Sequence, residues 1–183
     1  MTLPNAASAP VVADGLLIGR DALRQLHASL MSRAPDQAIA VLQEAGYAAG
    51  EGLYRSFAAV NSPTALDAGL LAETLSEFFT SGGWGAVTMS PVGTGALALD
   101  SSDWVEAEPG TSQTPMCFFS AGMLADFLGR LSDEPVSVME VECRSRGDAR
   151  CRFLSATPEV LQGVYEGMTQ GRTYEEVLSG EPR

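Results

Sequence analysis

Two cysteines placed symmetrically about a glycine constrain this chain more than any other feature of its sequence. Cys143 and Cys151 each lie four residues from Gly147. A tight turn centred on Gly147 would pair the two cysteines across an antiparallel hairpin, with their Cβ atoms about 4.5–5.5 Å apart. Two thiolates at that separation can share one tetrahedral zinc ion, with Zn–S bonds of about 2.3 Å. Cys117 is then a candidate third ligand, and Glu140 can supply an oxygen.

The residue pattern leaves other interpretations open. Buried cysteines often serve as small hydrophobic core residues, and Cys143 could instead form a cross-strand disulfide with Cys151. Glu140 and Cys143 are three residues apart, so an ideal strand points them to opposite faces of the sheet. Both can reach one metal only if a bulge or strong twist lies near residues 141–142. Glu142, which shares the parity of Glu140, is the alternative carboxylate ligand, and water is another candidate for the fourth position.

Length and charge limit the classes of protein to which the chain can belong. Its 183 residues are 45% hydrophobic, which suits one domain with a substantial core, and its net charge of −12 disfavours nucleic acid and anionic membranes as partners. Three cysteines are too few for a secreted disulfide framework. Neither a convincing signal peptide nor an apolar run long enough for a membrane span is present. We therefore expect a cytoplasmic protein with one domain over residues 15–178, a flexible tail at 1–14 and a short tail at 179–183.

The spacing of hydrophobic residues predicts an α+β fold. Helical periodicity dominates the first half of the chain, and short strand-like segments follow it. Because these strands do not alternate with helices, the sheet should be antiparallel and packed with helices. The expected elements, in order, are helices at 21–33, from 36 to about 57, and from Ser62-Pro63 to Gly82-Gly83, strands at 87–89 and 96–99, a helix at 117–131, a hairpin of 136–143 and 151–155, a helix from Thr157 to about 170, and a short helix from Thr173.

Two glycines stand inside the second expected helix. Gly46 and Gly50 each cost about 1 kcal/mol relative to alanine in a helix interior. Close approach of another backbone would offset that cost. The sequence does not say whether this backbone belongs to a neighbouring helix or to a second subunit.

The sequence contains no catalytic constellation. The single histidine, His27, falls in the first expected helix, where we expect it to be partly exposed, although it could also line a pocket. No nucleophile–base pair, phosphate loop or dinucleotide fingerprint accompanies it. The pattern favours a binding protein over an enzyme.

The C-terminal third resembles the 4-vinyl reductase domain family. The resemblance rests on Cys117 before a glycine-containing helix, a Glu-x-x-Cys strand ending at Cys143, a Gly-Asp turn at 147–148, and the Cys-x-Phe sequence that begins at Cys151. With the helical first half, it covers roughly residues 15–178. It implies the fold of the small TRAPP tethering-complex subunits and of the aromatic-sensing domains of phenol- and hydrocarbon-responsive regulators. These domains are usually homodimers through helices of the first half.

The resemblance also implies two sites. One is a structural zinc site formed by Cys117, Glu140, Cys143 and Cys151. The other is an apolar cavity between helices and sheet that takes a hydrophobic small molecule. Phenol-sensing relatives hold the phenol hydroxyl with a histidine and a tryptophan, and His27 is not at such a position, so a more apolar ligand is expected. The candidate ligand-binding residues are Phe78, Trp84, Trp104, Phe119, Met123 and Phe127.

Three functions from different classes fit these features. The first is a stand-alone homodimeric domain that binds or senses a hydrophobic or aromatic hydrocarbon and contains structural zinc. The second is an accessory protein or reductase-associated factor in tetrapyrrole metabolism of the chlorophyll type. The third is a ligand-free scaffold subunit. We favour the first, because no nicotinamide or flavin motif supports a reductase.

Overall fold

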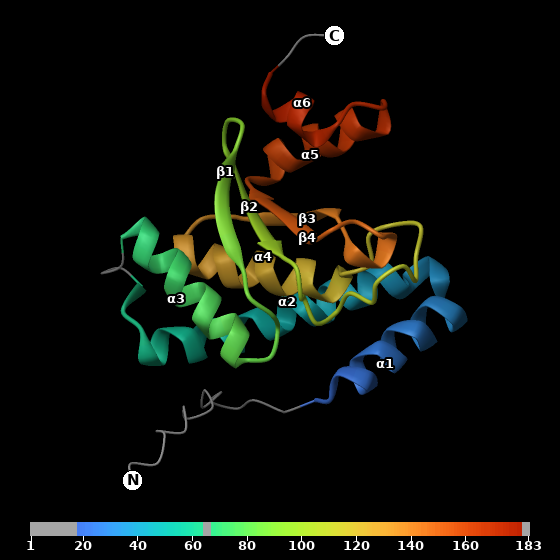
Figure 1. Cartoon of the computed structure of the whole chain (residues 1–183), viewed down its shortest axis with the longest axis horizontal. Helices are drawn as coiled ribbons and strands as arrows, with labels where there is room; N and C mark the ends of the chain where they lie inside the picture. The colour runs from blue at the N-terminus through green and yellow to red at the C-terminus, as the bar shows by residue number, and fades with distance from the viewer. Residues whose placement is uncertain (1–17, 64–66, 181–183) are drawn as a thin grey trace.

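The computed structural model describes residues 18–63 and 67–180 (Figure 1). Within these ranges the chain forms six α-helices and a four-stranded antiparallel sheet, which confirms the predicted α+β class. The predicted tail at 1–14 lies outside the described residues, as does 181–183 of the predicted C-terminal tail. None of the helices in the described part of the chain is long and apolar enough to cross a membrane.

Three helices make up the first half, much as the hydrophobic spacing predicts. They are α1 (Arg20–Arg33), α2 (Pro35–Val60) and α3 (Ala68–Ser81). The predicted start of the third helix at Ser62-Pro63 is wrong. Asp67 is the N-cap residue instead, and its side chain accepts a hydrogen bond from the Leu70 N–H at 2.9 Å. A carboxylate that satisfies a free N–H of the first turn defines the helix start.

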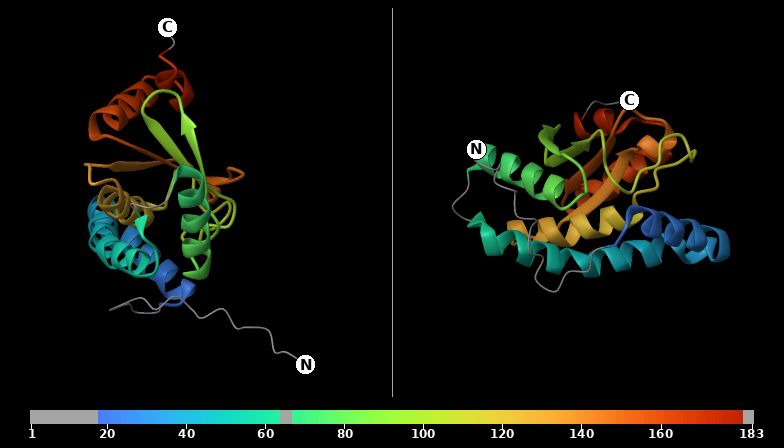
Figure 2. Two further views of the ribbon diagram at one scale, coloured as in Figure 1. Left: turned by 90° about the vertical axis from the view of Figure 1, so that its left-hand side faces the viewer. Right: turned by 60° about the horizontal axis from the view of Figure 1, so that its bottom comes forward.

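The second half places helices on both faces of the sheet. The strands lie in the order β1-β2-β4-β3, and all neighbours are antiparallel. Figure 2 shows the sheet between a layer that contains α2 and α4 and a layer that contains α5 and α6. The elements of this half are β1 (Thr88–Val92), β2 (Ala96–Ser101), α4 (Phe118–Ser132), β3 (Ser137–Glu142), β4 (Cys151–Ala156), α5 (Pro158–Thr169) and α6 (Tyr174–Leu178).

Alternation along the strands divides the core in two. Leu99 and Phe153 belong to the hydrophobic cluster that α2, α3 and α4 cover, whereas Ala98 and Leu154 belong to the cluster under α5 and α6. Successive strand residues point to opposite faces, so a sheet covered on both sides needs apolar residues at both parities. This explains why β2 and β4 are almost continuously buried.

The glycines of α2 lie where this helix crosses α4 within the same subunit. A Cβ atom at Gly46 would lie 1.9 Å from the carbonyl oxygen of Phe119, and one at Gly50 would lie 2.8 Å from that of Met123. On the other side of the crossing, a Cβ at Gly122 would lie 2.0 Å from the carbonyl oxygen of Gln43. The close approach is therefore between two helices of one chain, which settles the question that the sequence left open.

The connection between the two cysteines of the hairpin differs from the predicted tight turn. Residues Arg144–Arg146 form a short 3₁₀ helix, and Gly147 ends it with φ of 101°. Arg144 therefore does not pair with Arg150 across the hairpin. The Asp148 side chain explains the change, because it accepts the Cys143 N–H at 2.7 Å and thereby replaces a cross-strand partner.

Candidate metal centre

Four side chains from three separate segments converge at one buried point. Cys117 is the N-cap residue of α4, Glu140 lies in β3, Cys143 follows β3, and Cys151 is the first residue of β4. One ligand atom from each of them lies within 4.8 Å of the others. The structure thus brings together all four residues that the resemblance implied as ligands.

The sulfur atoms have the spacing of a metal site. Cys117 Sγ lies 3.9 Å from Cys143 Sγ and 4.0 Å from Cys151 Sγ. Three sulfurs on a tetrahedron with bonds of about 2.3 Å would be about 3.8 Å apart. All three cysteines are free thiols, so the cross-strand disulfide is not formed in this structure.

A β-bulge places Glu140 and Cys143 on the same side of β3. Glu140 pairs with Phe153 and Glu142 pairs with Arg152, so Val141 is an extra residue on this strand. A single extra residue reverses the parity of everything beyond it. This confirms the predicted irregularity near residues 141–142.

The Glu140 carboxylate has one oxygen fixed and the other without a partner. Its Oε2 accepts the N–H groups of Met116 at 3.1 Å and Cys117 at 2.9 Å. Its Oε1 is buried and has no hydrogen-bond partner. Leaving a buried acceptor unsatisfied costs about 1–3 kcal/mol, and coordination of a cation would remove that cost.

Glu142, the alternative carboxylate, has other partners. It accepts from the Tyr174 hydroxyl at 2.5 Å and from Arg150 at 3.0 Å. The structure therefore favours Glu140 over Glu142 as the oxygen donor of the cluster.

The charges at this point also call for a cation. The pKa of Cys143 is lowered, because Cys117 and Cys151 donate hydrogen bonds to its sulfur, whereas the pKa of Cys117 is raised. Burial, together with the neighbouring Cys143, raises the pKa of Glu140 to about 8. Three thiols and one carboxylate form the donor set that suits a tetrahedral zinc ion, which would neutralise this negative charge.

The six predicted ligand-binding residues meet in one cluster beside this centre. Trp104, Met123 and Phe127 are at most 1% exposed, and the half-buried Phe78, Trp84 and Phe119 pack against the same core, which also includes the three cysteines. Trp84 stacks on Phe119 with ring centroids 6.1 Å apart, and Phe78 stacks on Phe127 at the same distance. We call these six residues the aromatic cluster. Their role in ligand binding stays a prediction.

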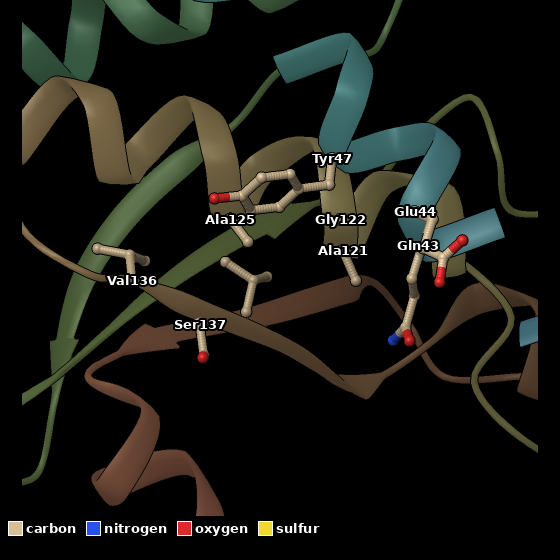
Figure 3. Close-up of a pocket in the computed structure, with 9 residues that line it drawn as sticks. Gln43, Glu44, Tyr47, Ala121, Gly122, Ala125, Val136 and Ser137 are labelled. Carbon is tan, nitrogen blue, oxygen red and sulfur yellow. The ribbon is translucent and has the colours of Figure 1, made fainter. Parts of the chain in front are cut away.

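Two cavities described in the structure lie elsewhere. One, of about 330 Å³, is bordered by α2, α4 and β3, with the Tyr47 ring lying across it (Figure 3). The other, of about 210 Å³, lies between α1 and the segment that precedes α4. Neither is lined by a member of the aromatic cluster.

Comparisons with known proteins agree with the position of this centre. Residues 102–156 match the model of the 4-vinyl reductase domain family. All four residues of the candidate metal centre lie within the matched segment, and the resemblance to this family is confirmed. No protein with a curated description matches the chain.

Solved structures with the same fold include two relatives of low sequence identity. The phenol-responsive sensory domain of the transcription activator PoxR, solved with phenol, is 18% identical and superposes with a TM-score of 0.64, covering 92% of this chain and 85% of that one. A vinyl-4-reductase family protein from Methanocaldococcus jannaschii is also 18% identical, with a TM-score of 0.50 and coverage of 81% and 87%. These similarities establish that the chain has the fold of 4-vinyl reductase domains.

Sequence reasoning missed a buried polar group in the matched segment. Glu106, which is 6% exposed, accepts the backbone N–H groups of Phe119 at 3.1 Å and Ser120 at 2.8 Å, and also the Ser120 hydroxyl. The same hydroxyl oxygen accepts the Trp104 indole N–H at 2.7 Å. Glu106 therefore serves as the N-terminal anion of α4 and ties the start of this helix to the aromatic cluster. No local sequence pattern marks this role, because Glu106 lies in a loop outside the helix.

His27 faces Glu106, and the expectation that His27 is partly exposed is wrong. The residue is only 8% exposed, and its Nδ1 lies 3.9 Å from Glu106 Oε1. Its ring packs edge-on against Phe118. The other possibility, that His27 lines a pocket, is correct.

Burial gives Glu106 a measurable effect on stability. It raises the pKa of this carboxyl from 4.5 to about 7, against the opposing hydrogen bonds from Ser120 and Phe119. Because the folded pKa lies above the unfolded one, the contribution to stability is full below about pH 4.5 and is lost as the pH rises through about 7. This difference corresponds to a loss of about 3 kcal/mol.

We expect the Glu106→Gln variant to lose less stability than the wild type between pH 5 and pH 8. Gln lacks the titrating proton but retains one acceptor oxygen for the α4 amides. Urea denaturation of both proteins at several pH values measures the difference. Identical pH dependence of the two proteins would contradict the assignment.

Proposed function

We propose that this chain is a domain of the 4-vinyl reductase type that binds and senses a hydrophobic small molecule, contains one structural zinc ion and acts as a cytoplasmic homodimer. One observation carries the proposal. Helix α4 begins at Cys117, a predicted metal ligand, and the same helix carries Phe119, Met123 and Phe127 of the aromatic cluster. The fold shared with the PoxR sensory domain gives it further support.

The zinc ion would act on the structure and take no part in catalysis. Four protein ligands complete a tetrahedral shell, so no position remains open for water or substrate. Bound there, the ion would join the start of α4 to the end of β3 and the start of β4. This would hold one wall of the aromatic cluster in place when a ligand enters.

The ligand would bind at the part of the cluster that solvent reaches. Phe78, Trp84 and Phe119 are half-buried, whereas the other three members are closed off. Phe78 and Trp84 come from α3 and the segment after it, and Phe119 comes from α4. A small shift of α3 away from α4 would admit an apolar molecule. Each Å² of its surface removed from water would contribute about 25 cal/mol.

Toluene binding tests this site. We expect toluene to shift the methyl NMR signals of Met89 and Met123, which pack in the same core. The Phe78→Ala variant should bind toluene about tenfold more weakly, a loss of about 1.4 kcal/mol. Leu70→Ala, an exposed position on the same helix, is the matched control and should bind normally. An unchanged spectrum would favour the ligand-free scaffold.

Two measurements on the purified protein test the rest of the proposal. Analytical ultracentrifugation should give the mass of a dimer, and a monomer at micromolar concentration would contradict the homodimer. Native mass spectrometry should detect a small molecule that denaturation releases.

A further inference from the structure

The cavity of about 210 Å³ beneath α1 has a polar lining that the proposed function does not use. On the α1 side, His27 and Arg24 are one helical turn apart. Across from them lie Glu106, Glu108 and Met116, which come from the segment that leads into α4. The cavity is therefore closed only by the packing of α1 against a loop.

Two buried nitrogen atoms of this lining lack partners. His27 Nε2 and Arg24 Nε are both inaccessible to solvent and make no hydrogen bond. His27 is more than nine-tenths buried. Buried polar groups in proteins are nearly always hydrogen-bonded, so two such atoms on one cavity wall point to a missing partner.

Charges around the cavity select a neutral partner. Glu106 and Glu108 oppose an anion, and Arg24 opposes a cation. Burial lowers the pKa of His27, so its ring is uncharged at neutral pH. A neutral imidazole presents a donor at one nitrogen and an acceptor at the other, and a hydroxyl can pair with either because it both donates and accepts. The same hydroxyl can accept from Arg24 Nε.

The remaining lining suits an apolar body of limited size. Leu23 and Met31 of α1 and Met116 of the opposite segment provide apolar contact. Since one water occupies about 30 Å³ in the liquid, 210 Å³ holds a molecule no larger than a single substituted ring.

We propose that this cavity is a second binding site, for a small neutral molecule with a hydroxyl group on an apolar body. The hydroxyl bonds to His27, and the apolar part lies between Met31 and Met116. The site is separate from the aromatic cluster and does not depend on ligand binding there. Glu106 connects the two, because the Ser120 hydroxyl bonds to both Glu106 and the Trp104 indole.

Methyl NMR on the metal-loaded protein locates the site directly. Four probes share one ring and differ in charge and polarity: benzyl alcohol, benzoate, benzylamine and toluene. We expect benzyl alcohol to shift the methyl signals of Met31 and Met116, and to bind at least tenfold more tightly there than any of the other three. Signals of Met89 and Met123 report on the aromatic cluster instead. If benzyl alcohol shifts only that second pair, or if benzoate or benzylamine binds more tightly at Met31 and Met116, the inference is overturned, and toluene binding at the cluster is still judged by its own result.

The His27→Phe variant tests the role of the imidazole. It keeps an aromatic ring of similar size but removes both nitrogens, so benzyl alcohol should lose at least tenfold in affinity while toluene binding at the aromatic cluster is unchanged. Gln25→Ala, an exposed position on the same helix, should bind benzyl alcohol as the wild type does. Undiminished affinity in His27→Phe would overturn the assignment. If this variant fails to fold, the four-probe comparison on the wild type still decides the proposal.

Discussion

The Gly46→Ala substitution is expected to lower the free energy of unfolding by about 3 kcal/mol or more, at the upper end of the usual cost of overpacking. The added methyl group would lie 1.9 Å from the Phe119 carbonyl oxygen, and a backbone atom cannot move aside as a flexible side chain can. α2 and α4 would have to separate along their whole crossing. Urea denaturation followed by circular dichroism measures the change.

Gly52→Ala is the matched control for this prediction. Gly52 lies in the same helix, and a Cβ atom there would meet nothing within 4 Å. The substitution should leave the fold unchanged and stabilise it by up to about 1 kcal/mol, the helix-propensity difference between glycine and alanine. Equal effects of the two substitutions would mean that α2 and α4 do not cross as closely as described.

The Cys151→Ser substitution is expected to remove the metal and about 5 kcal/mol of stability together, because a structural metal contributes directly to the free energy of folding. For a chain of this size, that loss lowers the Tm by about 15 °C. Elemental analysis of the wild type should give one zinc per chain, and a chelator should reproduce the loss of stability. A wild-type protein without metal, prepared in the absence of chelator, would contradict the zinc centre.

Paired glutamate variants test the ligand set with less disturbance of the fold. Glu140→Gln should weaken zinc binding, since Glu140 Oε1 is the free oxygen that faces no other partner. Glu142→Gln should retain one zinc per chain, because Glu142 pairs with Tyr174 and Arg150. The reverse result would assign the oxygen ligand to Glu142.

Periodic patterns predicted most elements, and local exceptions caused the errors. The stripes of α1, α2, α4 and α5 come from apolar residues at helical spacing, which reports the buried face without any tertiary knowledge. The start of α3 was wrong because Asp67, rather than Ser62, caps the helix. The turn at Gly147 was wrong because the Asp148 side chain competes for the Cys143 N–H. Both errors arise where one side chain competes for a backbone hydrogen bond, and periodicity carries no information about such competition.

The amino-acid sequence by itself determined the α+β class, the group of three cysteines with Glu140, and the need for a close backbone contact at Gly46. Each of these follows from residue spacing or from a property of one residue type. Only the tertiary structure decided that α4 provides this contact, that a bulge at Val141 makes Glu140 the candidate oxygen ligand, and that His27 lies buried against Glu106. These outcomes depend on which distant segments pack together, and packing is selected by the whole core rather than by local spacing.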